Sequence, residues 1–235
     1  NSELEPEPEP EPEQEPEPEP EPIPEEDLGL EWTRLLGSSD YEIAYGIATG
    51  NDGSIYITGP TNGDLDGLTN HGKNDVFISK FDSEGNKQWT KLIGSSNYES
   101  AFEVTTGHDG SIYIIGDTAS RDLDGLTIDG EDDIFISKFD SEGNKKWTKL
   151  TGSSRSDYAQ GITTGNDGSV YVAGFTRGQL DEKTENHFIR KFDSEGNEKW
   201  TKFIGSSFIL GSQELTTGND GSIYITGSTG GGQSS

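Results

Sequence analysis

Two equivalent loops of this sequence carry paired carboxylates that could bind a cation. Asp64 and Asp66 stand one residue apart in the first loop, and Asp122 and Asp124 repeat the pair farther along the chain. Calcium loops alternate oxygen ligands and place a glycine at a sharp turn. Residues 62–67, Asn-Gly-Asp-Leu-Asp-Gly, follow that pattern. These four aspartates are therefore candidate calcium ligands.

The second half of a calcium loop does not follow. The twelfth position counted from Asn62 is Lys73, whereas the same count from Ser120 reaches Glu131, and serine is a poor first ligand. The alternative is a solvated acidic loop whose aspartates hydrogen-bond their own backbone as turn formers. Calcium and turn formation both stay open, and no other cofactor is indicated.

Catalytic residues are not evident. The three histidines, His71, His108 and His187, fall at non-equivalent positions of the repeats and lack the spacing of a metal pair. Carboxylate pairs could transfer protons, but an active site needs one arrangement rather than several copies. No P-loop, GxGxxG or GxSxG motif occurs. The sequence therefore predicts a protein that is not an enzyme.

The composition restricts the partners. The formal net charge is −27, and residues 1–27 hold 12 Glu and Asp27 without any Lys or Arg. Such a chain repels nucleic acid and anionic membrane surfaces. No apolar run is long enough for a transmembrane helix, so membrane insertion is not expected. Cysteine is absent, which excludes disulfides and thiolate metal sites.

The two ends of the chain differ from its body. Glu and Pro alternate from Glu5 to Pro22 with Gln14 as the one interruption, and residues 1–27 are predicted to be an extended, disordered linker, because proline fixes φ and neighbouring carboxylates repel. Residues 230–235 form a flexible Gly/Ser end. Because Met and a signal-peptide pattern are both absent, we expect the chain to be a piece of a longer protein.

The body, residues 28–229, is a repeat array. Trp32, Trp89, Trp147 and Trp200 stand 57, 58 and 53 residues apart, each followed by Thr and a basic residue. A period of this length with several strand patterns is typical of β-propeller blades. The expected fold is all-β, with four-stranded antiparallel blades. The repeat boundaries are about 37–93, 94–151, 152–204 and, for a partial unit, 205–229.

Each full unit offers four strands, A to D, at 41–49, 54–59, 75–81 and 87–93 in the first unit. Asp-Gly pairs between A and B predict tight hairpin turns. A lone D strand over Glu31–Leu36 precedes three complete units, and an A–B pair ends near Thr226. Three complete blades plus partial ones cannot close regularly. Further blades from outside this chain, or a second copy, are therefore expected partners.

The repeats resemble a known family. Gly37-Ser38-Ser39-Asp40-Tyr41, the segment from Thr49 to Tyr56, Gly63-Asp64-Leu65-Asp66-Gly67, the segment from Asp75 to Lys80, and Trp89 are similar to the SBBP bacterial β-propeller repeats. The resemblance covers residues 31–229 and implies a propeller in an exported or surface-associated bacterial protein without a common activity. The third unit departs from it, because Gly174 to Phe188 is four residues shorter than Gly59 to Phe77.

These observations predict a non-enzymatic, calcium-supported scaffold or binding module of a bacterial exported or cell-surface protein. Its location would be extracellular, at the cell surface or periplasmic, and its ligand a protein or a glycan. The alternative is a fragment of a propeller enzyme, either a quinoprotein-like oxidoreductase or a glycan-cleaving enzyme.

Overall fold

The structure, a computed structural model, describes residues 31–180, 183–204 and 214–227. The chain separates into two units, Asn1–Thr33 and Arg34–Ser235, and every strand belongs to the second. The predicted linker at 1–27 and the predicted Gly/Ser end at 230–235 lie outside the described residues. The part of the chain that is described contains strands and turns but no helix, and hence no helix that could span a membrane.

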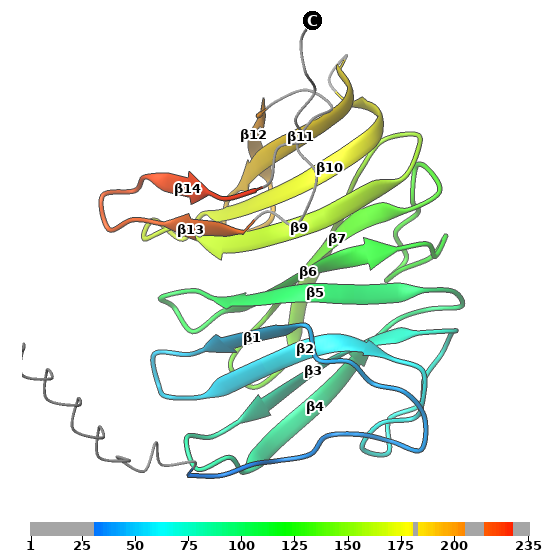
Figure 1. The fold of residues 1–235 in the computed structure, drawn as a ribbon, viewed down its shortest axis with the longest axis vertical. Coiled ribbons are helices and arrows are strands. Elements are labelled where there is room, and N and C mark those ends of the chain that lie inside the picture. Colours follow the sequence, from blue (N-terminus) through cyan, green and yellow to red (C-terminus); the bar gives the residue numbers. More distant parts are fainter. Residues whose placement is uncertain (1–30, 181–182, 205–213, 228–235) are drawn as a thin grey trace, which may run out of the picture. The chain divides into compact units, whose positions relative to one another are not determined.

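Three four-stranded antiparallel sheets follow one another along the chain (Figure 1). We call them the first, second and third blades, and each pairs its strands in chain order. The first blade comprises β1 (Gly46–Thr49), β2 (Ile55–Thr61), β3 (Asp75–Phe81) and β4 (Lys87–Ile93). The second comprises β5 (Glu99–Thr106), β6 (Ile112–Thr118), β7 (Asp133–Phe139) and β8 (Lys145–Thr151).

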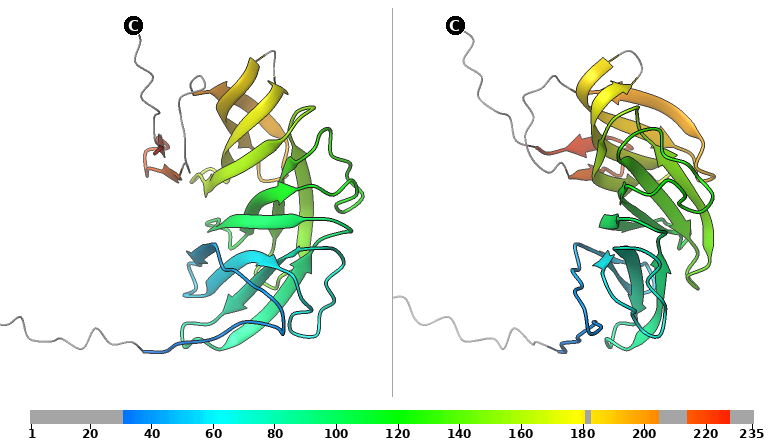
Figure 2. Two further views of the ribbon diagram at one scale, coloured as in Figure 1. Left: turned by 45° about the vertical axis from the view of Figure 1, so that its right-hand side comes forward. Right: turned by 90° about the vertical axis from the view of Figure 1, so that its right-hand side faces the viewer.

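The third blade comprises β9 (Asp157–Thr164), β10 (Val170–Leu180), β11 (Lys183–Phe192) and β12 (Glu198–Phe203). A two-stranded end sheet follows, formed by β13 (Leu215–Thr217) and β14 (Ile223–Ile225). The described sheets do not close into a ring (Figure 2). The predicted all-β array of four-stranded antiparallel blades is confirmed.

Aspartates shape the predicted turns between strands A and B and also the turns between strands C and D. Asp52 accepts a hydrogen bond from the Ser54 amide at 3.0 Å between β1 and β2. Asp82 accepts hydrogen bonds from the amides of Glu84 and Asn86, at 3.1 and 2.7 Å, between β3 and β4. The other blades repeat both patterns. These carboxylates are turn formers because a short acidic side chain mimics a backbone acceptor.

Blades pack face to face through strand B, whose side chains alternate between the two neighbours. In β6, Ile112 and Ile114 belong to the core shared with the first blade, whereas Tyr113 and Ile115 belong to the core shared with the third. All four are buried. Burying one such side chain contributes about 2 kcal/mol. We call these contacts the first, second and third blade junctions, the third joining the third blade to the end sheet.

The tryptophans mark the junctions. Trp89 packs on Tyr56 of its own blade, with ring centroids 6.1 Å apart, and its indole N–H donates to the carbonyl of Ser141 in the next blade at 3.3 Å. Trp147 repeats both contacts, with Tyr113 and with the Ser194 carbonyl at 3.2 Å. The tryptophans are therefore packing residues.

Two strand predictions were wrong in part. Residues 31–36 form no strand, and regular β1 is confined to Gly46–Thr49 rather than 41–49. A strand needs a partner for its amides, and within the described residues no strand pairs with 31–36. Arg34 nevertheless lies on the turn of the first blade, where its Nε donates to the Gly85 carbonyl at 2.9 Å.

Candidate functional site

The loop between β2 and β3 contains a tight hairpin. Leu65 and Leu68 exchange backbone hydrogen bonds of 3.0 and 2.9 Å around Asp66 and Gly67. Both central residues have positive φ, 56° and 77°, as a type I′ turn requires. Leu65 is buried and fixes the turn against the blade. The alternation that suggested a calcium loop therefore has a structural cause, since Asp-Gly suits this turn.

The turn brings Asp66 to strand D rather than to Asp64. Its carboxylate binds the ammonium of Lys87 and the hydroxyl of Thr90 on β4. Burial alone would raise the pKa of Asp66, but these two hydrogen bonds outweigh it and lower the pKa. Asp64 instead accepts a hydrogen bond from the Asn70 amide at 2.9 Å.

The second blade repeats the arrangement. Asp124 binds Lys145 and Thr148, and Asp122 accepts the Gly125 amide at 3.0 Å. The described residues contain no group of three or more His, Asp or Glu side chains placed to hold a metal ion. The four candidate calcium ligands thus bind lysine, threonine or backbone amide groups of the protein and do not form one cluster. Calcium binding remains a prediction.

The third blade builds the same ion pair from different strands. Arg190 on β11 occupies the position of Ser79 and Ser137, which bond to a threonine of strand D. Its Nε donates to Thr201 at 2.9 Å, and its Nη1 lies 3.5 Å from a carboxylate oxygen of Glu198. The cation therefore comes from strand C and the carboxylate from strand D, whereas in the first two blades strand D supplies the cation and the B–C turn supplies the carboxylate.

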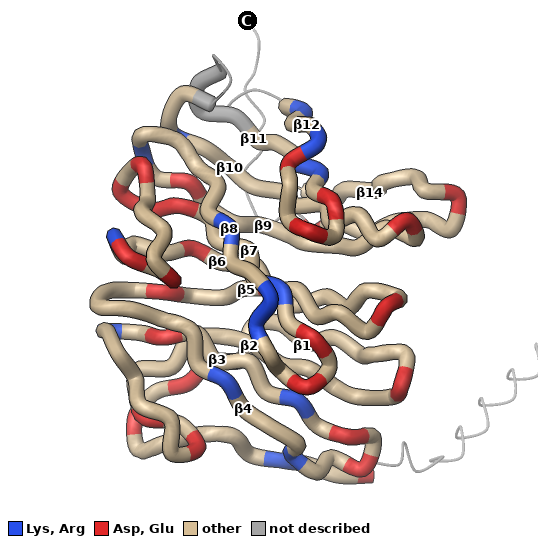
Figure 3. Tube along the Cα trace, turned by 180° about the vertical axis from the view of Figure 1, so that it is seen from behind, with Lys and Arg blue, Asp and Glu red and all other residues tan. Residues whose placement is uncertain are grey.

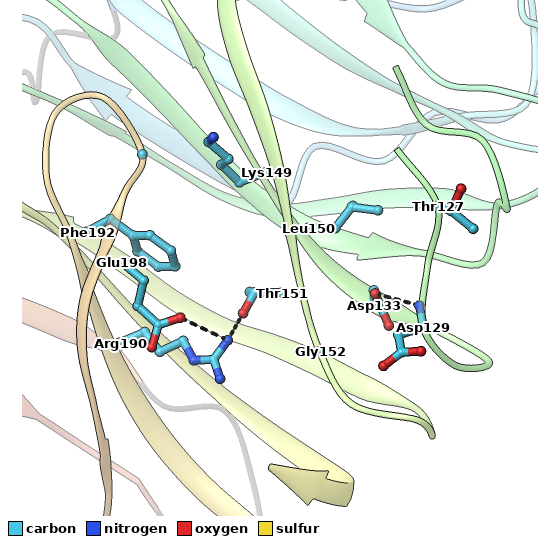
Figure 4. A pocket seen from close by; sticks show the side chains of 11 residues that line it. Thr127, Asp129, Asp133, Lys149, Leu150, Thr151, Gly152, Arg190, Phe192 and Glu198 are labelled. Carbon is cyan, nitrogen blue, oxygen red and sulfur yellow. Dashed lines mark hydrogen bonds and ion pairs between the residues drawn. The ribbon is translucent and has the colours of Figure 1, made fainter. Parts of the chain in front are cut away.

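A pocket of about 390 Å³ opens beside Arg190, between the second and third blades (Figure 4). The guanidinium also donates to Thr151 at the end of β8. Arg190 and Glu198 line one end of the pocket, and Asp129 and Asp133 line the other. Lys149, Thr127 and Phe192 complete the wall. The pocket combines both charges, hydroxyls and one aromatic ring.

Two carboxylates lie beside Gly152, which lines the pocket. Oxygens of Asp133 and Asp157 lie 2.6 and 2.9 Å from the point where a Cβ atom at Gly152 would stand. Burial raises the pKa of Asp133 to about 6, with a further contribution from Asp157. Burial also raises the pKa of Asp157, which the nearby charge of Arg190 counteracts. Gly152 therefore leaves room for two carboxylates that compete for protons.

Two further acids hold the backbone of the third blade. Asp117 accepts the Ala159 amide and Glu103 the Ile162 amide, each at 2.7 Å. Burial raises the pKa of Asp117 to about 8 and that of Glu103 to about 7. These amides flank an irregularity in the pairing of β9 with β10. The first junction has Pro60 and Gly46 at the equivalent positions, so this bracing belongs to the second junction alone.

Acidic side chains otherwise concentrate in the connections, whereas Lys and Arg follow the outer strands such as β4 and β8 (Figure 3). The histidines have structural partners. His108 bonds to Asn166 at 2.8 Å, and His187 bonds to Gln160 at 3.0 Å. His71 lies 3.5 Å from Asp75. The structure does not bring the three histidines into one constellation.

The sequence reasoning missed Arg190, Glu198, Asp117 and Glu103. One signal could have found the first two. When the three units are aligned, the same position of strand C holds Ser79, Ser137 and Arg190. The first position of strand D holds Lys87, Lys145 and Glu198. A charged residue that replaces a small one in a single repeat identifies a junction that differs from the others.

Stacked four-stranded antiparallel blades with a tryptophan on each outer strand define a β-propeller-type protein. Residues 31–66 match the model of the beta-propeller repeat called SBBP. The chain therefore contains a repeat of that family, which confirms the resemblance drawn from the sequence.

Two relatives are similar to this chain. One is the regulatory protein FlaEY of Caulobacter vibrioides, 26% identical over an alignment of 150 residues that covers 56% of this chain and 15% of that protein. The other is an uncharacterized WD repeat-containing protein of Acanthamoeba polyphaga mimivirus, 25% identical over an alignment of 186 residues that covers 61% of this chain and 13% of that protein. The chain thus spans about one seventh of these relatives.

Proposed function

We propose that this chain is a non-enzymatic scaffold and binding module, and that the pocket at the second junction is its ligand site. One observation carries the proposal: Arg190 and Glu198, which depart from the repeat, both line that pocket. The aspartates that do repeat serve turns and ion pairs. Residues that a propeller needs for folding recur in each blade, whereas a binding site needs its chemistry once.

The lining favours a glycan over an extended protein surface. Guanidinium, carboxylate and hydroxyl groups offer hydrogen bonds to sugar hydroxyls, and Phe192 offers one aromatic surface. A pocket of about 390 Å³ accommodates a small ligand rather than a broad interface. A glycan array probed with the chain tests the proposal. We expect binding that the double variant Arg190→Ser/Glu198→Lys, which restores the residues of the other blades, abolishes.

Lys145→Glu serves as the matched control, because it reverses one charge in the equivalent ion pair of the second blade, outside the residues that line this pocket. Equal binding by the unaltered chain and by the double variant would remove the pocket from the proposal. Binding lost equally in the control would indicate a charge effect on the whole blade rather than a site.

A glycan-cleaving enzyme is the second candidate, favoured by Asp133. A carboxyl in a pocket with a pKa near 6 is suited to general acid catalysis. Against it, Asp75 occupies the same buried position in the first blade. Hydrolysis of fluorogenic glycosides, lost in Asp133→Asn, would establish this alternative.

Calcium support is proposed for the loops that hold Asp64, Asp66, Asp122 and Asp124. A bound ion raises the melting temperature, so melts with calcium and with a chelator test it. Export to the bacterial surface or periplasm rests on the Glu-Pro linker. A signal peptide in the full reading frame would support export, and a fused catalytic domain would favour the enzyme.

A further inference from the structure

The outward side of the first blade leaves uncovered the positions that every other blade buries. Equivalent residues of strand A are Ile47, Val104, Ile162 and Leu215, and they are 71%, 3%, 1% and 7% exposed. Val104 and Ile162 are covered by the blade that precedes them in the chain. Ile55 and Ile57 of β2 are half-buried, whereas their equivalents Ile112 and Ile114 are fully buried.

The end sheet has the opposite exposed surface. Equivalent tyrosines of strand B are Tyr56, Tyr113, Tyr171 and Tyr224, and they are 2%, 2%, 6% and 56% exposed. The first three lie in the cores that face the following blade. Tyr224 is exposed because no blade follows β14 among the described residues. One end of the array thus shows an isoleucine face, and the other shows a tyrosine face.

A hydrogen-bond ladder ends at the same two places. Thr106 donates its hydroxyl to the Thr49 carbonyl at 2.9 Å, Thr164 to the Thr106 carbonyl at 2.9 Å, and Thr217 to the Thr164 carbonyl at 2.7 Å. The direction is constant along the chain. The first blade therefore presents the Thr49 hydroxyl, and the end sheet presents the Thr217 carbonyl, which together would form one more step.

We propose that these two ends bind each other in different copies of the chain, so that the face of Ile47 docks on the end sheet around Tyr224. The partner is a second copy because the three junctions show the chemistry that covers each face: the tyrosine side of one blade packs on the strand A aliphatic of the next. The contact joins unlike surfaces, and two copies related by a twofold axis satisfy both ends at once.

Charge is the main opposing factor. Two chains of net charge −27 repel, and Glu214 beside β13 adds a carboxylate at one end, but the side chains of Ile47, Thr49, Thr217 and Tyr224 are uncharged. Salt screens the repulsion between copies without weakening apolar contacts. Association is therefore expected to strengthen with ionic strength, the reverse of an interface held by ion pairs.

Light scattering on the full chain tests the proposal. We expect particles of twice the 25.5 kDa mass of one chain, and the fraction of chains in such particles should grow with concentration and salt. The variants Ile47→Asp and Tyr224→Asp should each give the mass of one chain. The matched control is Tyr98→Asp, which changes an exposed tyrosine on the second blade, at neither end of the array, and should still associate. Circular dichroism establishes that each variant is folded, and Ile47→Thr and Tyr224→Thr replace any variant that is not.

Mixing the two variants identifies the geometry. The Ile47→Asp copy retains an intact end sheet and the Tyr224→Asp copy retains an intact first blade, so the mixture should recover two-chain particles. Particles of one chain at every concentration and salt, or association of Tyr224→Asp alone, would overturn the proposal. Binding of an added propeller fragment by a chain that does not self-associate would likewise assign the face to another partner.

Discussion

Arg190 and Glu198 form an ion pair in the third blade where Lys87 and Asp66 form one in the first, and the first residue of strand D carries the carboxylate instead of the cation. The connection between strands B and C is four residues shorter in the third unit and has no Leu-Asp-Gly-Leu turn. The carboxylate therefore comes from strand D and the cation from strand C. Because Arg190 is longer than the serine it replaces, it also reaches Thr151 in the second blade.

Removing the cation of each ion pair should show that the two pairs contribute unequally to stability. Arg190→Ala breaks a buried guanidinium's bonds to Thr151 and Thr201, and we expect a loss of about 2 kcal/mol in the free energy of unfolding. In this variant the Glu198 carboxylate loses its partner but stays partly exposed to water, which limits the loss of stability. Lys87→Ala removes a partly exposed pair and should cost below about 1 kcal/mol. Urea unfolding measures both, and equal losses would contradict the distinction.

The indole hydrogen bonds give a second prediction. Trp147→Phe removes the bond to the Ser194 carbonyl, whereas Trp200→Phe makes the same change in ring size without a recorded indole bond among the described residues. We expect the first variant to lose about 1 kcal/mol more than the second, the net contribution of one hydrogen bond. Thermal and urea unfolding provide the comparison. A larger loss for Trp200→Phe would mean that ring packing dominates.

Stability should depend on pH through the second junction. Burial raises the pKa of Asp117 to about 8, far above the roughly 3.9 of an unfolded aspartate. Between these two pH values Asp117 is protonated in the folded chain and ionised in the unfolded chain. The stability that the buried Asp117 contributes is therefore fully present below about pH 4 and is lost as the pH rises through about 8. Glu103 and Asp133 act in the same direction.

Asp117→Asn keeps an acceptor for the Ala159 amide and removes the titration. We expect the free energy of unfolding to fall less steeply from pH 5 to 8, and the variant to exceed the unaltered chain at pH 8. Asp220→Asn is the control, because the Ser222 amide lowers the pKa of Asp220 and its contribution changes only in acid. Parallel pH curves for Asp117→Asn and the unaltered chain would show that this carboxyl does not titrate in that range.

Much of the fold could be predicted because the repeat supplies each element several times. The bounds predicted for β3 and β4 are those observed, and the Asp-Gly turns fall where expected. Glu31–Leu36 failed as a strand because its apolar pattern contains no information about the presence of a partner strand. The sequence predicted that the B–C connection of the third unit is shorter, but not that β10 and β11 extend into it as a hairpin.

The candidate site was harder to predict. Asp64 and Asp66 drew attention through their spacing, yet that spacing reflects a turn with two positive φ values. Asp117 and Glu103 stand among ordinary strand residues, and only the packing of two blades determines that they are buried beside the amides of β9. Long-range burial of this kind leaves no local signal in one sequence.

The turn itself offers a fourth prediction. Gly67 has φ of 77° and open space around its missing Cβ, so Gly67→Ala meets backbone strain without a clash. We expect a loss of about 1 kcal/mol. Asp66→Asn tolerates the same backbone but loses the Lys87 pair, and should cost less. Thermal unfolding ranks the two, and no loss for Gly67→Ala would argue against the type I′ turn.

Amide hydrogen exchange tests most directly that a blade is stabilised by the neighbours that cover its faces. At a concentration where light scattering gives the mass of one chain, we expect the slowest exchange in β6 and β7, which have covered faces on both sides, and the fastest in β13 and β14. Uniform protection across the sheets, or an end sheet as protected as β6, would contradict the stacked-blade structure.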